Sequence, residues 1–236
     1  MRMTDLTQLE VPEGLAAHLA ATTRDATVRG HRVPVAPAWW AAVLADNRLP
    51  GTVRPDSTSA DLPSLSRQAI FDLGGAITSS SDDEAVLTYL WHVLAWGSRG
   101  RNNRRRVASV ASQMPAAAAT LRQACIAARE SPEDGYRILR QGRSNAIPYL
   151  GPAFLTKVLY FAGGGTDGHH ALILDDRVAA ALSRRHGWHS LRTGGGWPPA
   201  TYTRYCDLLD RWASGTSTQD RTVAPDEIEY WLFSGG

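Results

Sequence analysis

Residues 147–178 read IPYLGPAFLTKVLYFAGGGTDGHHALILDDRV, and this stretch is the starting point for interpreting the rest of the sequence. It opens with a turn that contains Pro148 and Gly151, and an apolar run typical of a buried helix follows directly. After a glycine-rich loop comes ILDDRV, with the adjacent aspartates Asp175 and Asp176. We therefore expect a turn, a helix, and a loop that leads to a second helix opening at an aspartate.

Lys157 is the only lysine in a chain that carries 25 lysine and arginine residues. Arginine and lysine do comparable work as surface cations, but only the lysine amine can lose its proton and attack a carbon atom. A single lysine on an apolar helix, followed by an aspartate at the start of another, therefore indicates covalent catalysis. The alternative interpretation is a lysine paired with a carboxylate for structural reasons.

Composition limits the class of protein. The chain has 236 residues, of which 43% are hydrophobic and 20% charged, as in globular proteins. No apolar run reaches the ~20 residues of a membrane span, and the start, MRMTDLTQLE, lacks the apolar core of a secretion signal. Cys125 and Cys206 lie far apart, which favours a reducing compartment, and we see no convincing metal spacing. A cytoplasmic protein is the simplest interpretation.

The basic residues are unevenly distributed. The net charge is only +2, but five arginines crowd into GSRGRNNRRR at 97–106, directly after an apolar helical pattern. One interpretation is a solvated charged turn. The other is a DNA contact, because Asn102 and Asn103 within the cluster could bind phosphates or base edges.

Helical signals dominate the remaining sequence. Helices are expected at 15–22, 37–46, 66–74, 81–97, 107–130 with a break near Pro115, 131–142, 176–187, 201–213 and 225–233. Ser81 and Glu84 form a capping-box pattern for the fourth of these. There is no sustained strand-like alternation and no internal repeat, so the sequence predicts an all-α protein.

The turn at 147–151 predicts an anion site. A glycine-containing turn before a helix exposes unpaired backbone N–H groups, and with the helix dipole these bind phosphate. Gly151 allows close approach of the backbone, and Pro152 at the first helical position sacrifices no needed hydrogen bond. The turn, the lysine on the following helix and the aspartate opening the next form a more specific combination than any of the three alone.

These combined features resemble the helix-hairpin-helix superfamily of DNA base-excision glycosylases. Residues 151–161, with the pattern G-P-A-F-x-T-K-x-L-Y-F, are similar to short bacterial members of its 8-oxoguanine DNA glycosylase-like group. The similarity extends from about Ser79 to the end of the chain, whereas residues 1–60 resemble no family that we can name. The resemblance implies an all-α fold of two helical subdomains, here an N-terminal segment (1–78) that packs on a glycosylase-like core (79–236).

The resemblance also implies roles for individual residues. ILDDRV looks like the segment that carries the family's catalytic aspartate, which would be Asp175, with Lys157 as its amine partner. Phosphate and widowed-base contacts would come from the hairpin and the arginine cluster, at Tyr149, Gly151, Ala153, Arg99, Arg101, Asn102, Asn103 and Arg104. Candidates for stacking on a flipped base are Phe154, Phe161 and Trp231.

Two positions depart from the family pattern. Family hairpins usually have glycine where this chain has Tyr149, and many lyase members have their lysine where this chain has Ala153. Lys157 lies four residues later, on the same helix face and one turn deeper. A long side chain could still reach the same pocket.

The resemblance implies a bifunctional enzyme, a glycosylase and AP lyase that removes an oxidised purine, 8-oxoguanine first, through a lysine Schiff base. The expected partner is double-stranded DNA with the damaged base flipped out, and the expected protein is a monomer in the cytoplasm, at the nucleoid. No cofactor is expected, since Cys206 alone cannot hold an iron–sulfur cluster. The alternatives are a non-catalytic DNA-binding module and a glycosylase for another base. The opposite base, the strand preference and the role of residues 1–60 stay open.

Overall fold

The computed structural model describes residues 4–57, 62–77, 79–98 and 102–236. Within these ranges the chain is mostly helical, and the strands form only two short antiparallel pairs. The prediction of an all-α fold is confirmed. None of the described helices combines the length and apolar character required to cross a membrane.

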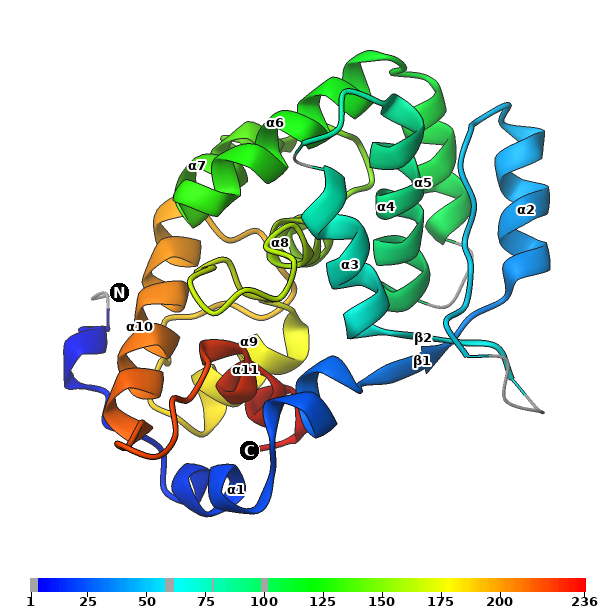
Figure 1. Cartoon of the computed structure of the whole chain (residues 1–236). Coiled ribbons are helices and arrows are strands. Elements are labelled where there is room, and N and C mark those ends of the chain that lie inside the picture. Colours follow the sequence, from blue (N-terminus) through cyan, green and yellow to red (C-terminus); the bar gives the residue numbers. More distant parts are fainter. Residues whose placement is uncertain (1–3, 58–61, 78, 99–101) are drawn as a thin grey trace.

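The helices occupy nearly the whole length of the chain (Figure 1). In chain order they are η1 (Leu6–Gln8), α1 (Leu15–Ala21), η2 (Asp25–Arg29), α2 (Pro37–Asp46), α3 (Arg67–Ile77), α4 (Asp83–Gly97), α5 (Asn102–Ala111), α6 (Ala116–Glu130), α7 (Pro132–Leu139), α8 (Pro152–Phe161), α9 (Asp176–Arg184), α10 (Pro199–Thr216) and α11 (Pro225–Ser234). The strand pairs are β1 (Arg32–Pro34) with β2 (Ser64–Ser66), and β3 (Arg140–Gln141) with β4 (Ser144–Asn145).

Helix α8 is the central element of the fold. It packs against α3, α4, α6 and α7, and Figure 1 shows it in the middle of the molecule. All residues from Phe154 to Phe161 are buried, as expected for a helix that is apolar on every side. This position takes Lys157 into the core.

Several helix starts follow from local sequence. Ser131 caps α7 by accepting a hydrogen bond from the N–H of Asp134 at 3.2 Å, and Pro132 occupies the first turn. Helices α2, α10 and α11 also begin at a proline, which fits the first turn because its missing N–H would have no partner there. The starts of α2, α7 and α11 agree with the sequence predictions, whereas α10, predicted at 201–213, begins two residues earlier and continues to Thr216.

Two other predicted boundaries are wrong. Helix α3 does not end at Gly74 but continues to Ile77, because Gly74 serves a close packing contact: a Cβ there would lie 1.9 Å from the carbonyl oxygen of Phe161. The cap of α4 is Asp82 rather than Ser81. Its carboxylate accepts from the N–H of Glu84 at 2.9 Å, so no Ser81–Glu84 capping box forms.

Two further segments differ from expectation. Residues 102–106, predicted within a loop, form the first turns of α5, which begins at Asn102. Helix α7 ends at Leu139 rather than near Gly142, because the β3–β4 hairpin begins at the next residue. Gly142 lies in the tip of that hairpin with a φ of +64°, a conformation that favours glycine.

The N-terminal segment is fastened to the last helix by ion pairs. Arg67, at the start of α3, pairs with Glu229 of α11 at 2.7 Å, and both side chains are fully buried. Arg24 binds Asp226 of α11 through two hydrogen bonds of 2.9 Å. Segments about 160 to 200 residues apart in sequence are thus held together in one core.

Candidate active site

Lys157 and Asp175 form an ion pair in the core. The Lys157 Nζ lies 3.0 Å from Asp175 Oδ2 and 3.4 Å from the carbonyl oxygen of Ala153. The side chains are only 6% and 15% exposed. The two residues singled out from the sequence are therefore in direct contact, and only a small part of their surface reaches solvent.

Asp175 is held in place by the start of α9. It is the N-cap residue of that helix, and its Oδ1 accepts from the N–H groups of Arg177 (3.1 Å) and Val178 (3.3 Å). Burial raises the pKa of Asp175, but the charge of Lys157 and these hydrogen bonds outweigh it and hold the pKa below its usual value. Asp175 is therefore an ionised carboxylate near neutral pH.

The chain leading to Asp175 is an extended segment without a neighbouring strand. Its buried backbone groups are paired with side-chain hydroxyls. The Tyr202 hydroxyl bonds both the N–H and the carbonyl of Leu172, the Tyr205 hydroxyl donates to the carbonyl of Ile173, and the Thr156 hydroxyl bonds both groups of Leu174. Two of these hydroxyls come from α10 and one from α8. They set the position of Asp175 relative to Lys157, the neighbour of Thr156 on α8.

The turn before α8 has the geometry that its sequence suggested. The N–H of Leu150 donates to the carbonyl of Ile147 at 3.2 Å, and Tyr149 has a φ of +63°. A turn with proline second and a left-handed third residue is of type II and favours glycine at the third position. Tyr149 therefore adopts a glycine-like backbone conformation, with its side chain 61% exposed.

The start of α8 is open to an anion. Gly151 is its N-cap residue and offers no side-chain cap, and Pro152 follows. Gly151, Pro152 and Ala153 are all partly exposed. The carbonyl of Ala153 accepts a hydrogen bond from Lys157. Ala153 is the position where many lyase members have their lysine, and it lies one helical turn before Lys157.

The residues of the arginine cluster have different surroundings. Asn102 and Arg104 are exposed, and the Arg104 guanidinium lies over the ring of Trp39 at 5.6 Å. Arg99 and Arg101, both predicted to bind DNA, lie outside the described residues.

The interpretation of Asn103 as a DNA contact needs correction. It is 1% exposed, and its amide donates to the carbonyls of Leu94 and Ser98 while its Oδ1 accepts from Arg106 at 2.7 Å. Its hydrogen-bonding groups are occupied within the protein, so Asn103 fixes the junction between α4 and α5.

Arg106 was not singled out from the sequence, yet it joins the cluster to the turn. Its guanidinium donates to the carbonyl of Tyr149 at 3.2 Å and to Asn103, and it lies 3.8 Å from the ring centre of Phe154. The start of α5 is thereby fixed against the turn. Sequence alone shows the positive charge of Arg106 but not these contacts.

The three proposed base-stacking residues are separated. Phe154 lies beside the ion pair, with Lys157 Nζ 5.9 Å from its ring centre. Phe161 is fully buried against Trp96, and Trp231 packs on His186 at 5.2 Å between ring centres. Phe161 and Trp231 have the surroundings of core residues, and Phe154 is the one of the three that lies next to Lys157.

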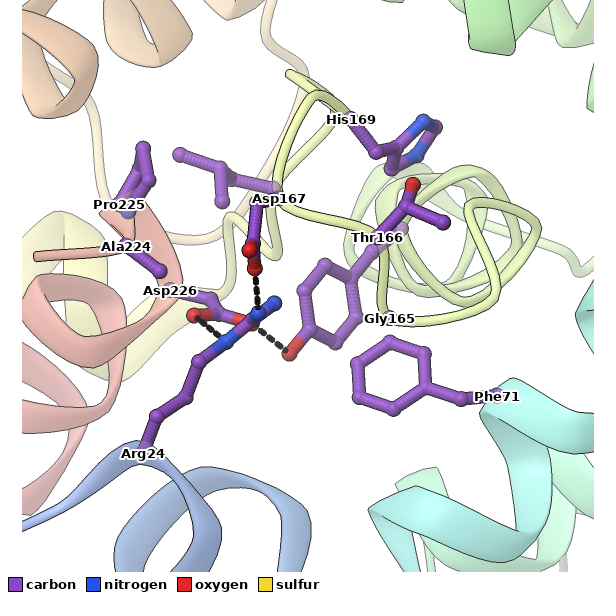
Figure 2. A pocket seen from close by; sticks show the side chains of 11 residues that line it. Arg24, Phe71, Gly165, Thr166, Asp167, His169, Ala224, Pro225 and Asp226 are labelled. Atoms are coloured by element: carbon purple, nitrogen blue, oxygen red, sulfur yellow. Dashed lines mark hydrogen bonds and ion pairs between the residues drawn. The ribbon is translucent and has the colours of Figure 1, made fainter. Parts of the chain in front are cut away.

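A second polar network joins α3, α8 and α11. The Tyr160 hydroxyl donates to Asp226 at 3.0 Å and accepts from Arg67 at 3.2 Å, and Arg67 binds Glu229. Figure 2 shows Arg24 inserted between Asp167 and Asp226. The spacing of Asp226 and Glu229, three residues apart in the final helix, which also carries Glu227, was a sequence signal for this network.

No group of three or more histidine, cysteine or acidic side chains is placed to hold a metal ion within the described ranges. Cys125 and Cys206 are both free and buried.

Comparison with known proteins identifies a family for nearly the whole chain. Residues 26–233 match a family model described as "Putative 8-oxoguanine DNA glycosylase OGG-like protein". Neither the curated proteins nor the solved structures contain a match.

Proposed function

Because the chain belongs to this family of 8-oxoguanine DNA glycosylase-like proteins, we propose that it excises an oxidised purine and then cleaves the strand through a Schiff base on Lys157. Membership of the family supports the general role of a DNA glycosylase, with DNA as its partner. The identity of the base, the lyase step and the residues that perform them are our proposal.

The observation that carries the proposal is the buried contact between Lys157 and Asp175 at 3.0 Å. Removing two charges from water costs about as much as their attraction returns, so a buried ion pair is a poor way to stabilise a core. A pair of apolar side chains would fit α8 at least as well. A reactive amine beside a fixed carboxylate, by contrast, serves covalent catalysis directly.

The reaction then follows from ordinary amine chemistry. Lys157 first passes its ammonium proton to water, and the neutral amine then bonds to C1′ as the bond from C1′ to the base breaks. The departing base takes the electron pair of that bond and one proton from the newly bonded nitrogen. The nitrogen lone pair then forms the double bond to C1′ as the C1′–O4′ bond of the sugar ring breaks. O4′ takes that electron pair and a proton from water, and a protonated imine results. The imine acidifies the C2′ hydrogen, and loss of that proton expels the 3′ phosphate.

Asp175 acts mainly through its charge. Its lowered pKa makes it a weak base but a stable anion, placed where the sugar becomes positive during departure of the base. It also receives a hydrogen bond from Lys157 and so holds the nitrogen in place. Asp176 is exposed and accepts from the N–H of Gly194, which suits a supporting role in the neighbouring loop.

DNA contacts are proposed for the turn and the start of α5. Phosphate would bind the open N-terminus of α8 at Gly151 and Ala153, with Tyr149 exposed next to it. Asn102 and Arg104 would face the duplex, and Asn102 takes the widowed-base contact that Asn103 cannot make. We keep Arg99 and Arg101 as proposed phosphate contacts.

We further propose a monomer that works at the nucleoid on double-stranded DNA with its target base flipped out. The segment 1–78 would act as a unit that packs on the helix-hairpin-helix core 79–236. The pairs Arg24–Asp226 and Arg67–Glu229 support this arrangement, because each joins the N-terminal segment to α11.

Borohydride trapping tests the proposal. Wild type, Lys157→Arg, Asp175→Asn and the control Asp176→Asn are incubated with a duplex that carries 8-oxoguanine opposite cytosine, or with one that carries an abasic site. We expect a covalent adduct from wild type and Asp176→Asn on both duplexes, no adduct from Lys157→Arg, and a slowed reaction from Asp175→Asn.

The pattern of failure is informative. An adduct on the abasic duplex alone would support Schiff-base formation by Lys157 and refute 8-oxoguanine as the substrate. DNA binding without any adduct would refute the lyase and favour the non-catalytic binding module. That alternative assigns Lys157 to a phosphate, although a side chain only 6% exposed is poorly placed for one.

A further inference from the structure

Three aromatic rings pack around the ring of His31. The His31 ring, on the segment between η2 and β1, makes contact with three others at 5.2–5.8 Å between ring centres: Trp96 of α4, and Tyr230 and Phe233 of α11. Trp96 is 7% exposed, whereas the other three rings are partly exposed. We call these four residues the aromatic cage. The cage therefore extends from three partly exposed residues to the buried Trp96.

The cage and the adjoining Arg67 contain buried polar atoms without hydrogen-bond partners. Within the part of the chain that the structure describes, no hydrogen-bond partner exists for His31 Nδ1, Trp96 Nε1 or Arg67 Nε. Arg67 lies against the Trp96 ring at 5.1 Å, so the three atoms belong to one cluster. The terminal nitrogens of Arg67 are engaged by Glu229 and Tyr160, and only its Nε is unpaired. Such groups are costly to bury and are usually satisfied in folded proteins, which is why their clustering suggests a ligand.

The cage borders the proposed catalytic pair. Trp96 precedes Gly97, where an added Cβ would lie 3.2 Å from Cδ of Lys157. On the other side, the Phe233 ring lies 4.9 Å from the guanidinium carbon of Arg177, whose backbone N–H binds Asp175. The cage is therefore connected to Lys157 through Gly97, the neighbour of Trp96, and to Asp175 through Arg177, which contacts Phe233.

We propose that the aromatic cage receives the extruded base, that the His31 ring occupies the space of this base until it arrives, and that the N–H groups of Trp96 Nε1 and Arg67 Nε read the carbonyl oxygens of the base. This inference deepens the proposed glycosylase function and depends on it for the origin of the base. It moves the base pocket away from Phe161 and Trp231 and assigns specificity to residues of α3 and α4.

The hydrogen-bonding capacity of the site favours an oxidised purine. Trp Nε1 and Arg Nε are obligate donors, so they require acceptors on the ligand. 8-Oxoguanine carries carbonyl oxygens at C6 and C8, one on each ring. Unmodified guanine has its acceptors on this edge, O6 and N7, at neighbouring positions and none on C8, so a donor placed to bind the C8 oxygen would be left buried and unpaired. A site built in this way rejects the analogue that lacks the hydrogen-bonding group.

His31 is suited to be displaced. Burial, and next the nearby charge of Arg67, lower its pKa to about 4, so the ring is neutral at physiological pH. Its position is fixed by the backbone, where its N–H binds Val28 and its carbonyl accepts from Arg67. Rotation of the side chain would break no hydrogen bond at Nδ1. The extruded base then replaces the His31 ring, and its carbonyl oxygens accept hydrogen bonds from Trp96 Nε1 and Arg67 Nε.

Paired tryptophan variants test the reading of the base. Trp96→Phe keeps an aromatic ring and removes the N–H group. Trp91→Phe is the matched control on the same helix, because its Nε1 donates to the carbonyl of Pro50 at 2.9 Å. Single-turnover rates are measured on the 8-oxoguanine duplex and on the abasic duplex, which has no base to read. The rate on the 8-oxoguanine duplex divided by the rate on the abasic duplex should be about tenfold lower in Trp96→Phe than in Trp91→Phe.

Calorimetry with free 8-oxoguanine tests the displacement. Removing the ring in His31→Ala should tighten binding of the free base by about three- to tenfold, because the site no longer has to be vacated. His18→Ala on α1 is the control and should bind as wild type does. Guanine is titrated alongside and should bind more weakly than 8-oxoguanine to each protein.

The outcomes separate this inference from the proposed function. A protein that cleaves neither duplex refutes the lyase proposal, while the titrations of the free bases still test the cage. Equal rate ratios in Trp96→Phe and Trp91→Phe, together with unchanged affinity in His31→Ala, would overturn the inference. Cleavage of abasic DNA without release or binding of 8-oxoguanine would overturn it as well, because the two donors were assigned to the two carbonyl groups of that base.

Discussion

Two of the buried ion pairs, Arg67–Glu229 and Lys157–Asp175, differ in how completely they are enclosed. Arg67 and Glu229 have no exposed side-chain surface, and the Tyr160 hydroxyl is a second hydrogen-bonding partner of the Arg67 side chain. Lys157 and Asp175 are 6% and 15% exposed. An arginine cannot give up its proton in a protein, whereas a lysine can. The first pair therefore holds the chain together, and the second has the access and the chemistry of a reactive site.

The carboxylates of the two pairs respond differently to burial. At Glu229, burial raises the pKa and outweighs the opposing effect of Arg67. At Asp175, burial acts in the same direction, but Lys157 and the N-terminus of α9 outweigh it, so the pKa falls. At Asp175 the charge and hydrogen bond of Lys157, followed by the two N–H groups of α9, keep the carboxylate ionised, and ionisation is what the proposed reaction requires.

The largest effect is expected when the enclosed pair is broken. Arg67→Leu leaves Glu229 buried without a partner, and the free energy of unfolding in urea should fall by about 3–5 kcal/mol. Adding Glu229→Leu should recover much of the loss, since an apolar pair of similar volume is tolerated. A loss below about 1 kcal/mol in the single variant would show that water reaches Glu229 and that the two pairs are enclosed alike.

A smaller effect, on the rate, is expected at the reactive pair. Asp175→Asn keeps the acceptor that caps α9 but removes the charge beside the sugar. The single-turnover rate on the 8-oxoguanine duplex should fall about a hundredfold, and the free energy of unfolding should change by less than about 1 kcal/mol because asparagine is also a good N-cap. If instead the loss appeared in stability with the rate intact, Lys157–Asp175 would be a second structural pair.

The pH dependence of stability sharpens the same contrast. The pKa of Asp175 is lowered on folding from its usual 3.8, so its ionisation stabilises the folded protein above that pH. The stabilisation is lost as the pH falls through the lower folded-state value. The difference in unfolding free energy between wild type and Asp175→Asn should therefore be constant from pH 7 to about 5 and shrink below 3.8. A difference that persists unchanged at pH 3 would argue against the lowered pKa.

The smallest effect is expected at the turn that precedes the reactive lysine. Tyr149 adopts a φ of +63°, which costs a non-glycine residue roughly 1–2 kcal/mol, and glycine recovers this cost at the expense of about 0.4–1 kcal/mol of chain entropy. Tyr149→Gly should raise the free energy of unfolding by about 0.5 kcal/mol, whereas Tyr149→Ala, which keeps the strain, should not. Equal stabilities of the two variants would place the strain elsewhere.

Local features of the sequence predicted much of this structure. The helix starts at Pro37 and Pro225, the Ser131 cap and the apolar run around Lys157 involve residues close together in sequence, and the structure agrees with each. The approach of Lys157 to Asp175 could also be predicted, because only 18 residues and one loop separate the two in sequence.

Contacts between distant segments could not be predicted in this way. Arg67 and Glu229 are 162 residues apart, and neither sequence neighbourhood indicates its partner. Asn103 appeared to be a DNA contact because asparagine among arginines is common at such sites, but Leu94 and Ser98 bury it. Gly74 looked like a helix stop, although it is required by the close approach of Phe161. In each case packing from another segment decided the outcome.

The hydroxyl groups of Tyr202, Tyr205 and Thr156 do for residues 172–174 what a neighbouring strand does in a sheet: they set the register. One residue of slip along an extended chain is about 3.3 Å, which is more than a hydrogen bond to Lys157 could tolerate. Because the hydroxyl groups that set this register belong to α8 and α10, a change in the spacing of these two helices would move the Asp175 carboxylate relative to the Lys157 amine. The alignment of the proposed catalytic pair is thus a property of helix packing as much as of the two residues themselves.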